Sequence, residues 1–177
     1  MEVLDSFKLK DDKEVIIRLA EKKDLDQIMA VYDEAKAFMI ARGNDAQWVG
    51  GYPQRTLIEE DIEAGQLYVC EEDAAIYGVF ALIMGEDPTY ALIENGDWKN
   101  DRPYGTIHRI GSNGKNRGIF KAAIDFCKTR SDELRIDTHE KNTIMRRLIV
   151  ENGFEERGII YIADGTPRIA YQYSAEE

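Results

Sequence analysis

The sequence predicts an α/β protein whose central sheet is mixed but mostly antiparallel, contains one parallel strand–helix–strand crossover, and carries helices on both faces. Short runs of β-branched residues alternate along the chain with longer segments whose apolar residues recur at helical spacing. The order strand–helix–strand over residues 104–138 requires a parallel crossover. The strands before and after this unit follow one another closely and suit antiparallel hairpins, so all of them can join one mixed sheet.

The first half of the chain supplies a strand, two helices and two further strands. Residues 1–13 are polar and are expected to form an N-terminal extension of a single domain over residues 14–177. Asp24 is expected to open the first helix, with Gln27 completing a partial capping box. The expected elements are a strand at residues 14–19, a helix from Asp24 to Gly43, a helix with a Thr56–Glu59 capping box that ends at Gly65, and strands at residues 67–70 and 76–84.

The second half follows an irregular stretch over residues 85–103 and alternates strands with helices. Asn142 is expected to cap the last helix, which Gly153 ends. The expected elements are a strand at residues 104–110, a helix with an apolar stripe over residues 119–127, a strand at residues 134–138, the helix from Asn142 to Gly153, and strands at residues 158–163 and 168–173.

Composition limits the classes of protein to which the chain can belong. The 177 residues include 44% hydrophobic residues, which suits one globular domain, and the net charge of −11 argues against nucleic acid as a partner. No stretch reaches the ~18 apolar residues of a membrane span, and the N-terminus lacks a signal-peptide pattern. Cys70 and Cys127 are too few for a disulfide framework or a zinc site. We therefore expect two buried thiols and a cytoplasmic protein that does not bind a membrane.

Residues 104–120 (YGTIHRIGSNGKNRGIF) form the most informative segment, a strand that runs through a glycine-bearing loop into a helix. Gly114 and Gly118 let the backbone approach an anion, Lys115 and Arg117 add positive charge, and the unpaired amides of the helix start point outward. Residues 109–130 hold six basic residues and one acidic residue in an otherwise acidic chain. The pattern indicates a diphosphate site, although a solvated basic helix face is the alternative, and it matches neither the Walker nor the dinucleotide spacing.

The run Lys115-Asn116-Arg117-Gly118-Ile119-Phe120 resembles the [QR]-x-x-G-x-[GA] signature of the GNAT superfamily of N-acetyltransferases, and the spacing from Asn142 to Gly153-Phe154 resembles a second signature of that family. The order of elements also matches, from about residue 15 to residue 173. The resemblance implies the GNAT-like acyl-CoA N-acyltransferase fold, with acetyl-CoA as co-substrate and no metal. It implies that loop amides bind the CoA pyrophosphate, and that the preceding strand pairs with the pantetheine arm and polarises the thioester carbonyl. The implied cofactor-binding residues are His108, Arg109, Ile110, Lys115, Asn116, Arg117, Gly118, Ile119, Phe120 and Asn142.

Three positions depart from the pattern of the family. Lys115 stands where Arg or Gln is usual, and Phe120 replaces a small residue, so its ring would crowd the diphosphate unless it turns into the core. Ile149 occupies the position of a tyrosine that often protonates the leaving thiolate, so the usual general acid is missing.

Three residues are candidates for proton transfer. His108, on the strand that would line the acetyl site, could deprotonate the amine. His139 follows the next strand, at an end that borders the cleft, and Asp137 is not expected to orient it because adjacent strand residues point to opposite faces. Tyr104 starts the central strand and could relay a proton through water. The alternative for His108 is a hydrogen-bonded role in or near the core, and for Tyr104 it is packing. His139 could instead be a substrate contact or a cap at the end of the strand.

Four aromatic residues in the irregular loops are candidates for contact with the acceptor: Trp48, Tyr52, Tyr90 and Trp98. Each could instead fill the apolar interior of its own loop.

The sequence thus predicts an N-acetyltransferase in which a small-molecule or peptide amine attacks acetyl-CoA directly, in a ternary complex. A non-catalytic acyl-CoA-binding or regulatory module on the same fold is the alternative, because Ile149 and Phe120 depart from the pattern. A protein-interaction domain that has lost its cofactor site is a third reading. The edges of the last strands offer a contact for a homodimer.

Overall fold

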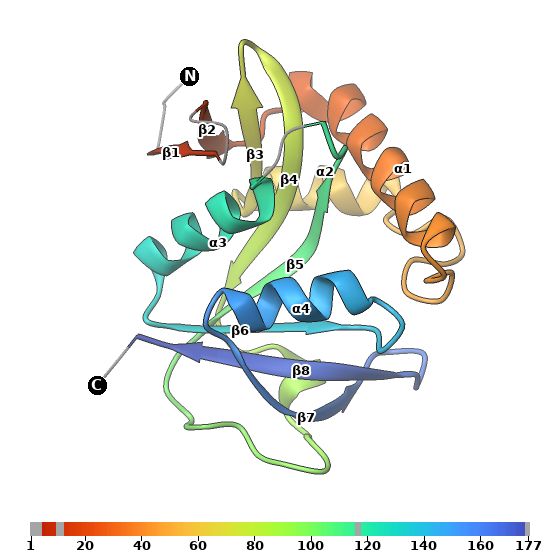
Figure 1. Cartoon of the computed structure of the whole chain (residues 1–177), viewed down its shortest axis with the longest axis vertical. Helices are drawn as coiled ribbons and strands as arrows, with labels where there is room; N and C mark the ends of the chain where they lie inside the picture. Colours follow the sequence, from red (N-terminus) through yellow and green to blue (C-terminus); the bar gives the residue numbers. More distant parts are fainter. Residues whose placement is uncertain (1–4, 10–12, 116–117, 176–177) are drawn as a thin grey trace.

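An eight-stranded mixed sheet forms the centre of the computed structural model, which describes residues 5–9, 13–115 and 118–175. The strand order is β1-β2-β3-β4-β5-β6-β8-β7 (Figure 1). Only β5 and β6 pair in parallel, and α3 connects them, so the predicted fold class is confirmed. The strands are β1 (Asp5–Lys8), β2 (Glu14–Leu19), β3 (Leu67–Glu72), β4 (Ala75–Met84), β5 (Gly105–Ser112), β6 (Glu133–Thr138), β7 (Glu155–Tyr161) and β8 (Pro167–Ser174).

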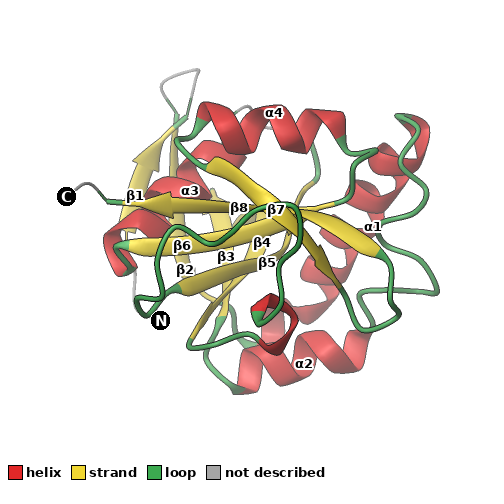
Figure 2. Ribbon diagram, turned by 90° about the horizontal axis from the view of Figure 1, so that it is seen from below, coloured by secondary structure: helices red, strands yellow, loops and turns green. Residues whose placement is uncertain are grey.

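Helices cover both faces of this sheet, and Figure 2 shows α4 and α2 on opposite sides of it. The helices are α1 (Leu25–Ala41), α2 (Arg55–Glu63), α3 (Ile119–Arg130) and α4 (Thr143–Glu151), with short 3₁₀ turns η1 (Lys22–Asp24) and η2 (Pro88–Tyr90). Apolar residues of α1 and α2 share one buried cluster with β3 and β4, whereas α3 and α4 share a second cluster with β4, β5 and β6.

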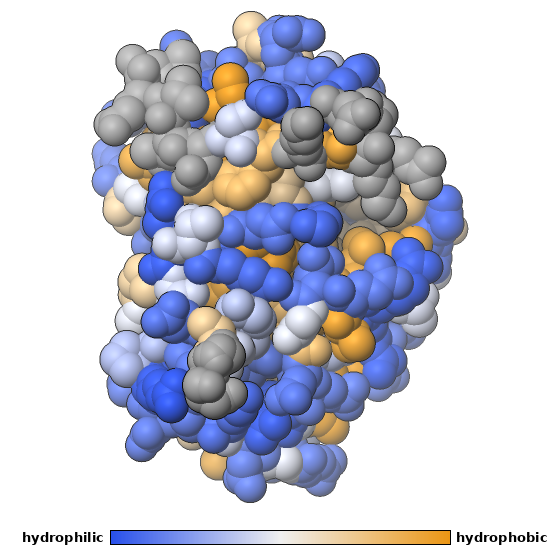
Figure 3. Space-filling model, turned by 60° about the vertical axis from the view of Figure 1, so that its left-hand side comes forward, coloured by the Kyte–Doolittle hydropathy of each residue, from blue (hydrophilic) through white to orange (hydrophobic). Residues whose placement is uncertain are grey.

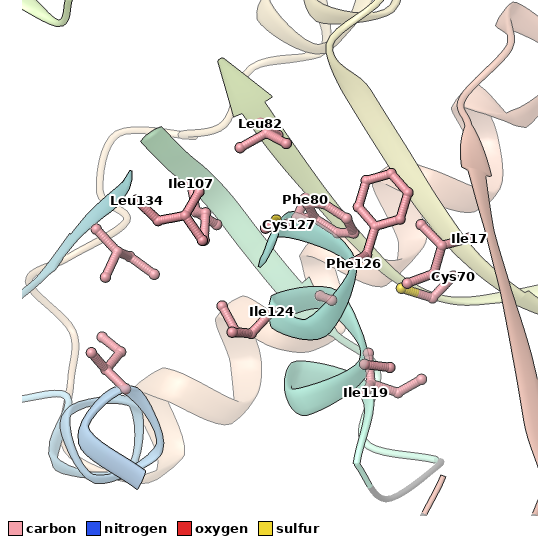
Figure 4. Close-up of a cluster of buried hydrophobic side chains, with 14 of the residues drawn as sticks. Ile17, Cys70, Phe80, Leu82, Ile107, Ile119, Ile124, Phe126, Cys127 and Leu134 are labelled. Atoms are coloured by element: carbon pink, nitrogen blue, oxygen red, sulfur yellow. The ribbon is translucent and has the colours of Figure 1, made fainter. Parts of the chain in front are cut away.

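The core beneath α3 fixes this helix against the middle of the sheet. Phe126 and Ile124 on α3 pack with Phe80 of β4 and Ile107 of β5 (Figure 4). Each fully buried side chain of this size contributes roughly 1.5–3 kcal/mol. A Cβ at Gly78 would lie 2.5 Å from Cγ2 of Ile119, so only glycine lets the first turn of α3 approach β4 this closely. Cys70 and Cys127 are free and buried, as predicted.

The surface on the side of α3 is largely hydrophilic. Figure 3 shows apolar colour mainly in recesses between polar side chains on that face. No described helix is long and apolar enough to cross a membrane.

At the starts of the helices, one of the three predicted caps is confirmed and two are wrong. The capping boxes predicted for the first two helices are wrong. Asp24 instead closes a box with Glu21 around η1 and binds Arg18, and α2 begins at Arg55, which places Thr56 inside the helix. The predicted cap at Asn142 is confirmed, since its side chain accepts a hydrogen bond from the amide of Met145 at 3.1 Å.

The N-terminal segment also differs in detail from the expectation. Residues Asp5–Lys8, within the expected polar extension, form β1 and pair antiparallel with β2. Phe7 explains why this short strand docks, because its ring lies edge-on to Phe126 of α3 with 6.3 Å between centroids.

Candidate active site

A cavity of about 810 Å³ opens between β5 and β6. These two strands pair only at Gly105–Leu134 and Thr106–Arg135, and beyond that point they diverge while both continue to line the cavity. Within the described residues, the edge of β5 that faces away from β4 therefore has no strand partner from Ile107 onward. Its backbone groups are available to a ligand that lies along the strand.

A bulge in β5 accompanies the divergence. Between the pairs Val79–Gly111 and Ala81–His108, the single residue Phe80 of β4 faces two residues of β5, Arg109 and Ile110. Arg109 lies within the bulge and adopts a φ of +52°, a conformation that a non-glycine residue holds only when its surroundings enforce it. Bulges of this kind re-aim side chains and backbone groups next to active sites.

Arg109 is held by three partners. Its guanidinium donates to both carboxylate oxygens of Asp61 at 2.9 and 3.0 Å and to the hydroxyl of Tyr52 at 3.2 Å. The Tyr32 hydroxyl donates to the Arg109 carbonyl at 2.7 Å. The side chain is thus used for structure, and the part that Arg109 offers to a ligand is its backbone.

His108 lines the cavity beside Asp87, with 2.8 Å between Nε2 and Oδ2. This hydrogen bond, with further bonds from Thr89, lowers the pKa of Asp87 to about 2 against the effect of burial. An ionised carboxylate can only accept, so Nε2 of His108 must carry the proton. When the imidazole is neutral, its basic lone pair is consequently on Nδ1.

Tyr104 lies beneath this pair and is buried. Its hydroxyl accepts from the backbone amide of Asp87 at 2.8 Å, so it helps to hold the residue that orients His108. Tyr104 does not line the cavity. Of the three predicted proton-transfer residues, Tyr104 is therefore placed to position His108 through Asp87.

Tyr90 and Trp98 belong to a small buried cluster under the long loop, away from the cavity lining. The Trp98 indole donates to the Tyr90 carbonyl at 2.8 Å, and the Tyr90 hydroxyl donates to Asp137 at 2.6 Å. Trp48 and Tyr52, in contrast, line the cavity, where Trp48 packs edge-on against Tyr32. The structure therefore brings two of the four predicted acceptor contacts to the cavity.

The predicted diphosphate loop borders the same cavity through Gly114, Gly118, Ile119 and Phe120. Gly118 is the N-cap of α3 with a φ of +89°, and a Cβ at Gly114 would meet no atom within 4 Å. The Phe120 ring packs against the core under α3, which is the orientation that relieves crowding of the loop. Lys115 is exposed beside this opening, and Asn116 and Arg117 lie outside the described residues.

The far wall is built on α4 and the end of β6. Asn142 lines the cavity and donates to Oε1 of Gln47 at 3.2 Å, in addition to capping α4. His139 does not line the cavity; its Nδ1 accepts from the amide of Lys141 at 3.1 Å within the turn. Ile149 is fully buried in the apolar cluster, so it adds no acid to this wall.

Asp87, Asp137 and Arg168 are among the polar residues that line the cavity and to which the sequence assigned no role. Burial raises the pKa of Asp137, while His108 and Arg168 act in the opposite direction. No short motif surrounds any of the three, so only the fold brings them together. Among the described residues, no group of three or more His, Cys, Asp or Glu side chains could hold a metal ion.

Comparison with solved structures places this architecture among known acetyltransferases. A GNAT-family acetyltransferase from Streptococcus agalactiae is 33% identical over 92% of this chain and 96% of its own, with a TM-score of 0.79. A GNAT-family acetyltransferase from Listeria monocytogenes is 20% identical over 96% and 99% of the two chains, with a TM-score of 0.72. A chain of the NatC complex bound to Gag peptide and CoA is 12% identical over 90% and 98%, with a TM-score of 0.60.

The latter two likenesses, at their low identity, concern the fold alone. A scan against protein-family models and a search of curated proteins found no match.

Proposed function

Because this chain belongs to the GNAT family of acetyltransferases, we propose that it transfers the acetyl group of acetyl-CoA to a primary amine by direct attack in a ternary complex. The observation that carries the proposal is the pairing of His108 with Asp87 on the wall of the cavity between β5 and β6. The pair supplies a base of defined tautomer at the place where two substrates could meet.

The cavity suits acetyl-CoA as the first substrate. Its volume of about 810 Å³ lies within the range of roughly 300–1,000 Å³ that is usual for ligand sites. The unpaired edge of β5 beyond Thr106 offers backbone donors and acceptors to the amide-bearing pantetheine arm. The N-terminus of α3, with Gly114 and Gly118 beside it, favours the diphosphate.

The chemistry follows from the position of His108. Nδ1 takes a proton from the ammonium form of the amine, and the amine nitrogen then attacks the thioester carbonyl carbon. The carbon–sulfur bond breaks, the nitrogen of the new amide loses its second proton to solvent, and the thiolate leaves. Solvent supplies the proton to the thiolate, since Ile149 provides no acid. A backbone amide in the bulge around Arg109 is the proposed donor to the carbonyl oxygen.

Thiol release during incubation with acetyl-CoA and a panel of amines tests the activity. We expect His108→Gln to reduce kcat by on the order of 10²–10⁴ while acetyl-CoA still binds. His139→Gln is the matched control, because His139 does not line the cavity, and it should retain the rate. Loss of activity in the His139 variant with retention in the His108 variant would reassign the base. No release above background with any amine would count against the proposal.

A non-catalytic acyl-CoA-binding module is the second candidate, favoured by the apolar, fully buried Ile149. Calorimetry with acetyl-CoA distinguishes the two, since this candidate binds without turnover. Gly114→Asp and Gly114→Asn test the site itself, because the two side chains have the same shape, have open space at this position and share the strain that a φ of +76° imposes. The added charge should weaken binding by about 5- to 30-fold relative to Asn, and less at high salt. Equal affinities for the two variants would show that the diphosphate lies elsewhere.

A further inference from the structure

Arg168, on β8, is a buried cation on the wall of the cavity. Its exposed fraction is 5%. It donates to the Pro167 carbonyl at 2.8 Å, to the Thr166 hydroxyl at 3.1 Å and to the Gln47 carbonyl at 3.5 Å, all of which are neutral. No carboxylate among the described residues lies within 4.0 Å of its guanidinium. Asp137 and Asp164 act on Arg168 only from beyond this distance. A buried guanidinium without a contacting carboxylate is costly, so the arrangement suggests that a bound anion completes it.

The other two strongly buried arginines show how this chain usually compensates such a charge. Arg18 is paired with Asp24 and Glu71 at 2.8 and 2.6 Å. Arg135 lies between the rings of Trp98 and Tyr104, at 3.9 and 3.8 Å from their centroids. Arg168 has neither kind of partner, and it alone of the three lines the cavity. Its Nε and the remaining Nη2 hydrogen are unused among the described residues, and a guanidinium fork matches a carboxylate.

The sheet places Arg168 on the same wall as the proposed base. In the β6–β8 ladder Asp137 stands opposite Ala170, so Arg168, two residues along, is its diagonal neighbour on the same face. The positive charges of Arg168 and of protonated His108 both lower the pKa of the Asp137 carboxyl group. The wall therefore presents the base His108 on β5, the carboxyl group of Asp137 on β6 and the cation Arg168 on β8.

We propose that the acceptor is an amine that also carries a carboxylate, an amino-acid-like zwitterion, and that Arg168 binds its carboxylate. This inference rests on the proposed function, because it names the substrate class of the same site. Asp87 attracts the ammonium group towards His108, and Arg168 holds the carboxylate at the other end of the molecule. Arg168 is thus a specificity residue, while the proton is transferred to His108.

Steady-state thiol release with matched acceptors tests the proposal. A set of L-amino acids is compared with the corresponding amino-acid amides and decarboxylated amines, and the rates are compared at equal concentrations of free base. We expect the wild-type kcat/KM to favour the carboxylates by on the order of 10- to 100-fold. In Arg168→Gln, the kcat/KM for carboxylates should fall by on the order of 10- to 100-fold, towards the level of the neutral amines, whose own values should change much less. Arg168→Lys keeps the charge without the fork and should give an intermediate preference.

Separate readouts distinguish the possible failures. If wild type acetylates amines without preferring carboxylates, the inference is wrong and the proposed function stands. A preference for O-phosphoethanolamine over every carboxylate would assign the cation to a phosphate and overturn the carboxylate. If no amine is acetylated, the proposed function fails, and calorimetric titration of the same amino acids in the presence of CoA decides the inference. Binding by wild type that Arg168→Gln abolishes supports it, and absence of binding by wild type overturns it. Unchanged CoA affinity and melting temperature in Arg168→Gln exclude general unfolding as the cause.

Discussion

Replacing Asp87 by asparagine tests the charge interaction that defines the proposed base. The carboxylate of Asp87 accepts from His108 at 2.8 Å and from the amide and hydroxyl of Thr89 at 2.9 and 2.7 Å. The bond with His108, opposed by burial and aided by those from Thr89, lowers the pKa from its ordinary value of 3.8 to about 2. The folded protein therefore binds this proton less tightly than the unfolded chain, and stability rises with pH through this range.

The size of the effect follows from the shift. Lowering the pKa from 3.8 to about 2 corresponds to about 2 kcal/mol of folding free energy, for a side chain that is only 18% exposed. This stabilisation is complete well above pH 4, roughly half lost at pH 3, and nearly gone at pH 2. Asparagine keeps the shape and can still accept from Thr89, but it has no charge to offer His108.

Urea unfolding followed by tryptophan fluorescence measures the prediction. At pH 7 we expect Asp87→Asn to unfold with about 2 kcal/mol less free energy than wild type, and at pH 3 with about 1 kcal/mol less. Asp101→Asn, at an exposed position, is the control and should change the free energy of unfolding by less than about 0.5 kcal/mol. Equal stability of Asp87→Asn and wild type at pH 7, or a difference that stays constant down to pH 3, would show that the charge of Asp87 does not supply this stabilisation.

Three further predictions concern catalysis, capping and the bulge. Asp87→Asn should lower kcat by on the order of 10²-fold or more, because the new asparagine amide can donate to Nε2 of His108 and so move the imidazole proton to Nδ1. An unchanged kcat in thiol-release assays would contradict this. Asn142→Ala should destabilise α4 and reduce the free energy of unfolding by about 1 kcal/mol, measured in urea, whereas Asn142→Asp should retain most of it. Asp61→Asn leaves the buried guanidinium of Arg109 without its ion pair and should cost about 3–5 kcal/mol in the same measurement; a loss below 1 kcal/mol would mean that the pair does not hold the bulge.

Local sequence patterns predicted the fold because they coincide with the physical causes of its elements. Strong helical and β-branched periodicity located every helix and seven of the eight described strands. The strand that was missed, Asp5–Lys8, contains a single apolar residue, Phe7, and its pairing depends on a distant ring of α3. The wrong capping boxes have a related cause. Asp24 fits the pattern of a cap, but the buried Arg18 takes up its carboxylate.

The candidate site also contains residues whose positions local sequence patterns predicted and residues whose positions they did not. The positions of His108 and of the loop at Gly114 and Gly118 beside the cavity were predictable, because they depend on consecutive residues. Asp87 and Arg168 were not, because their positions depend on pairing between strands and on a loop that returns to the sheet. Tyr90 and Trp98 show the converse limit. An irregular stretch of this length needs an apolar interior, and their rings provide it without lining the cavity.

The bulge at Arg109 depends on contacts from residues on the side of α1 and α2. A regular β5 would continue to pair with β4 without the extra residue, and the conformation at Arg109 would be relaxed. Asp61 and Tyr52 fix the side chain, and Tyr32 fixes the carbonyl, so three residues from the α1 and α2 side enforce a strained backbone. Strain that is held by so many contacts is expected where the backbone itself acts on a ligand. The prediction that Asp61→Asn destabilises the protein therefore has a functional counterpart: acetyl-CoA affinity in the surviving folded fraction should fall, although Asp61 does not line the cavity.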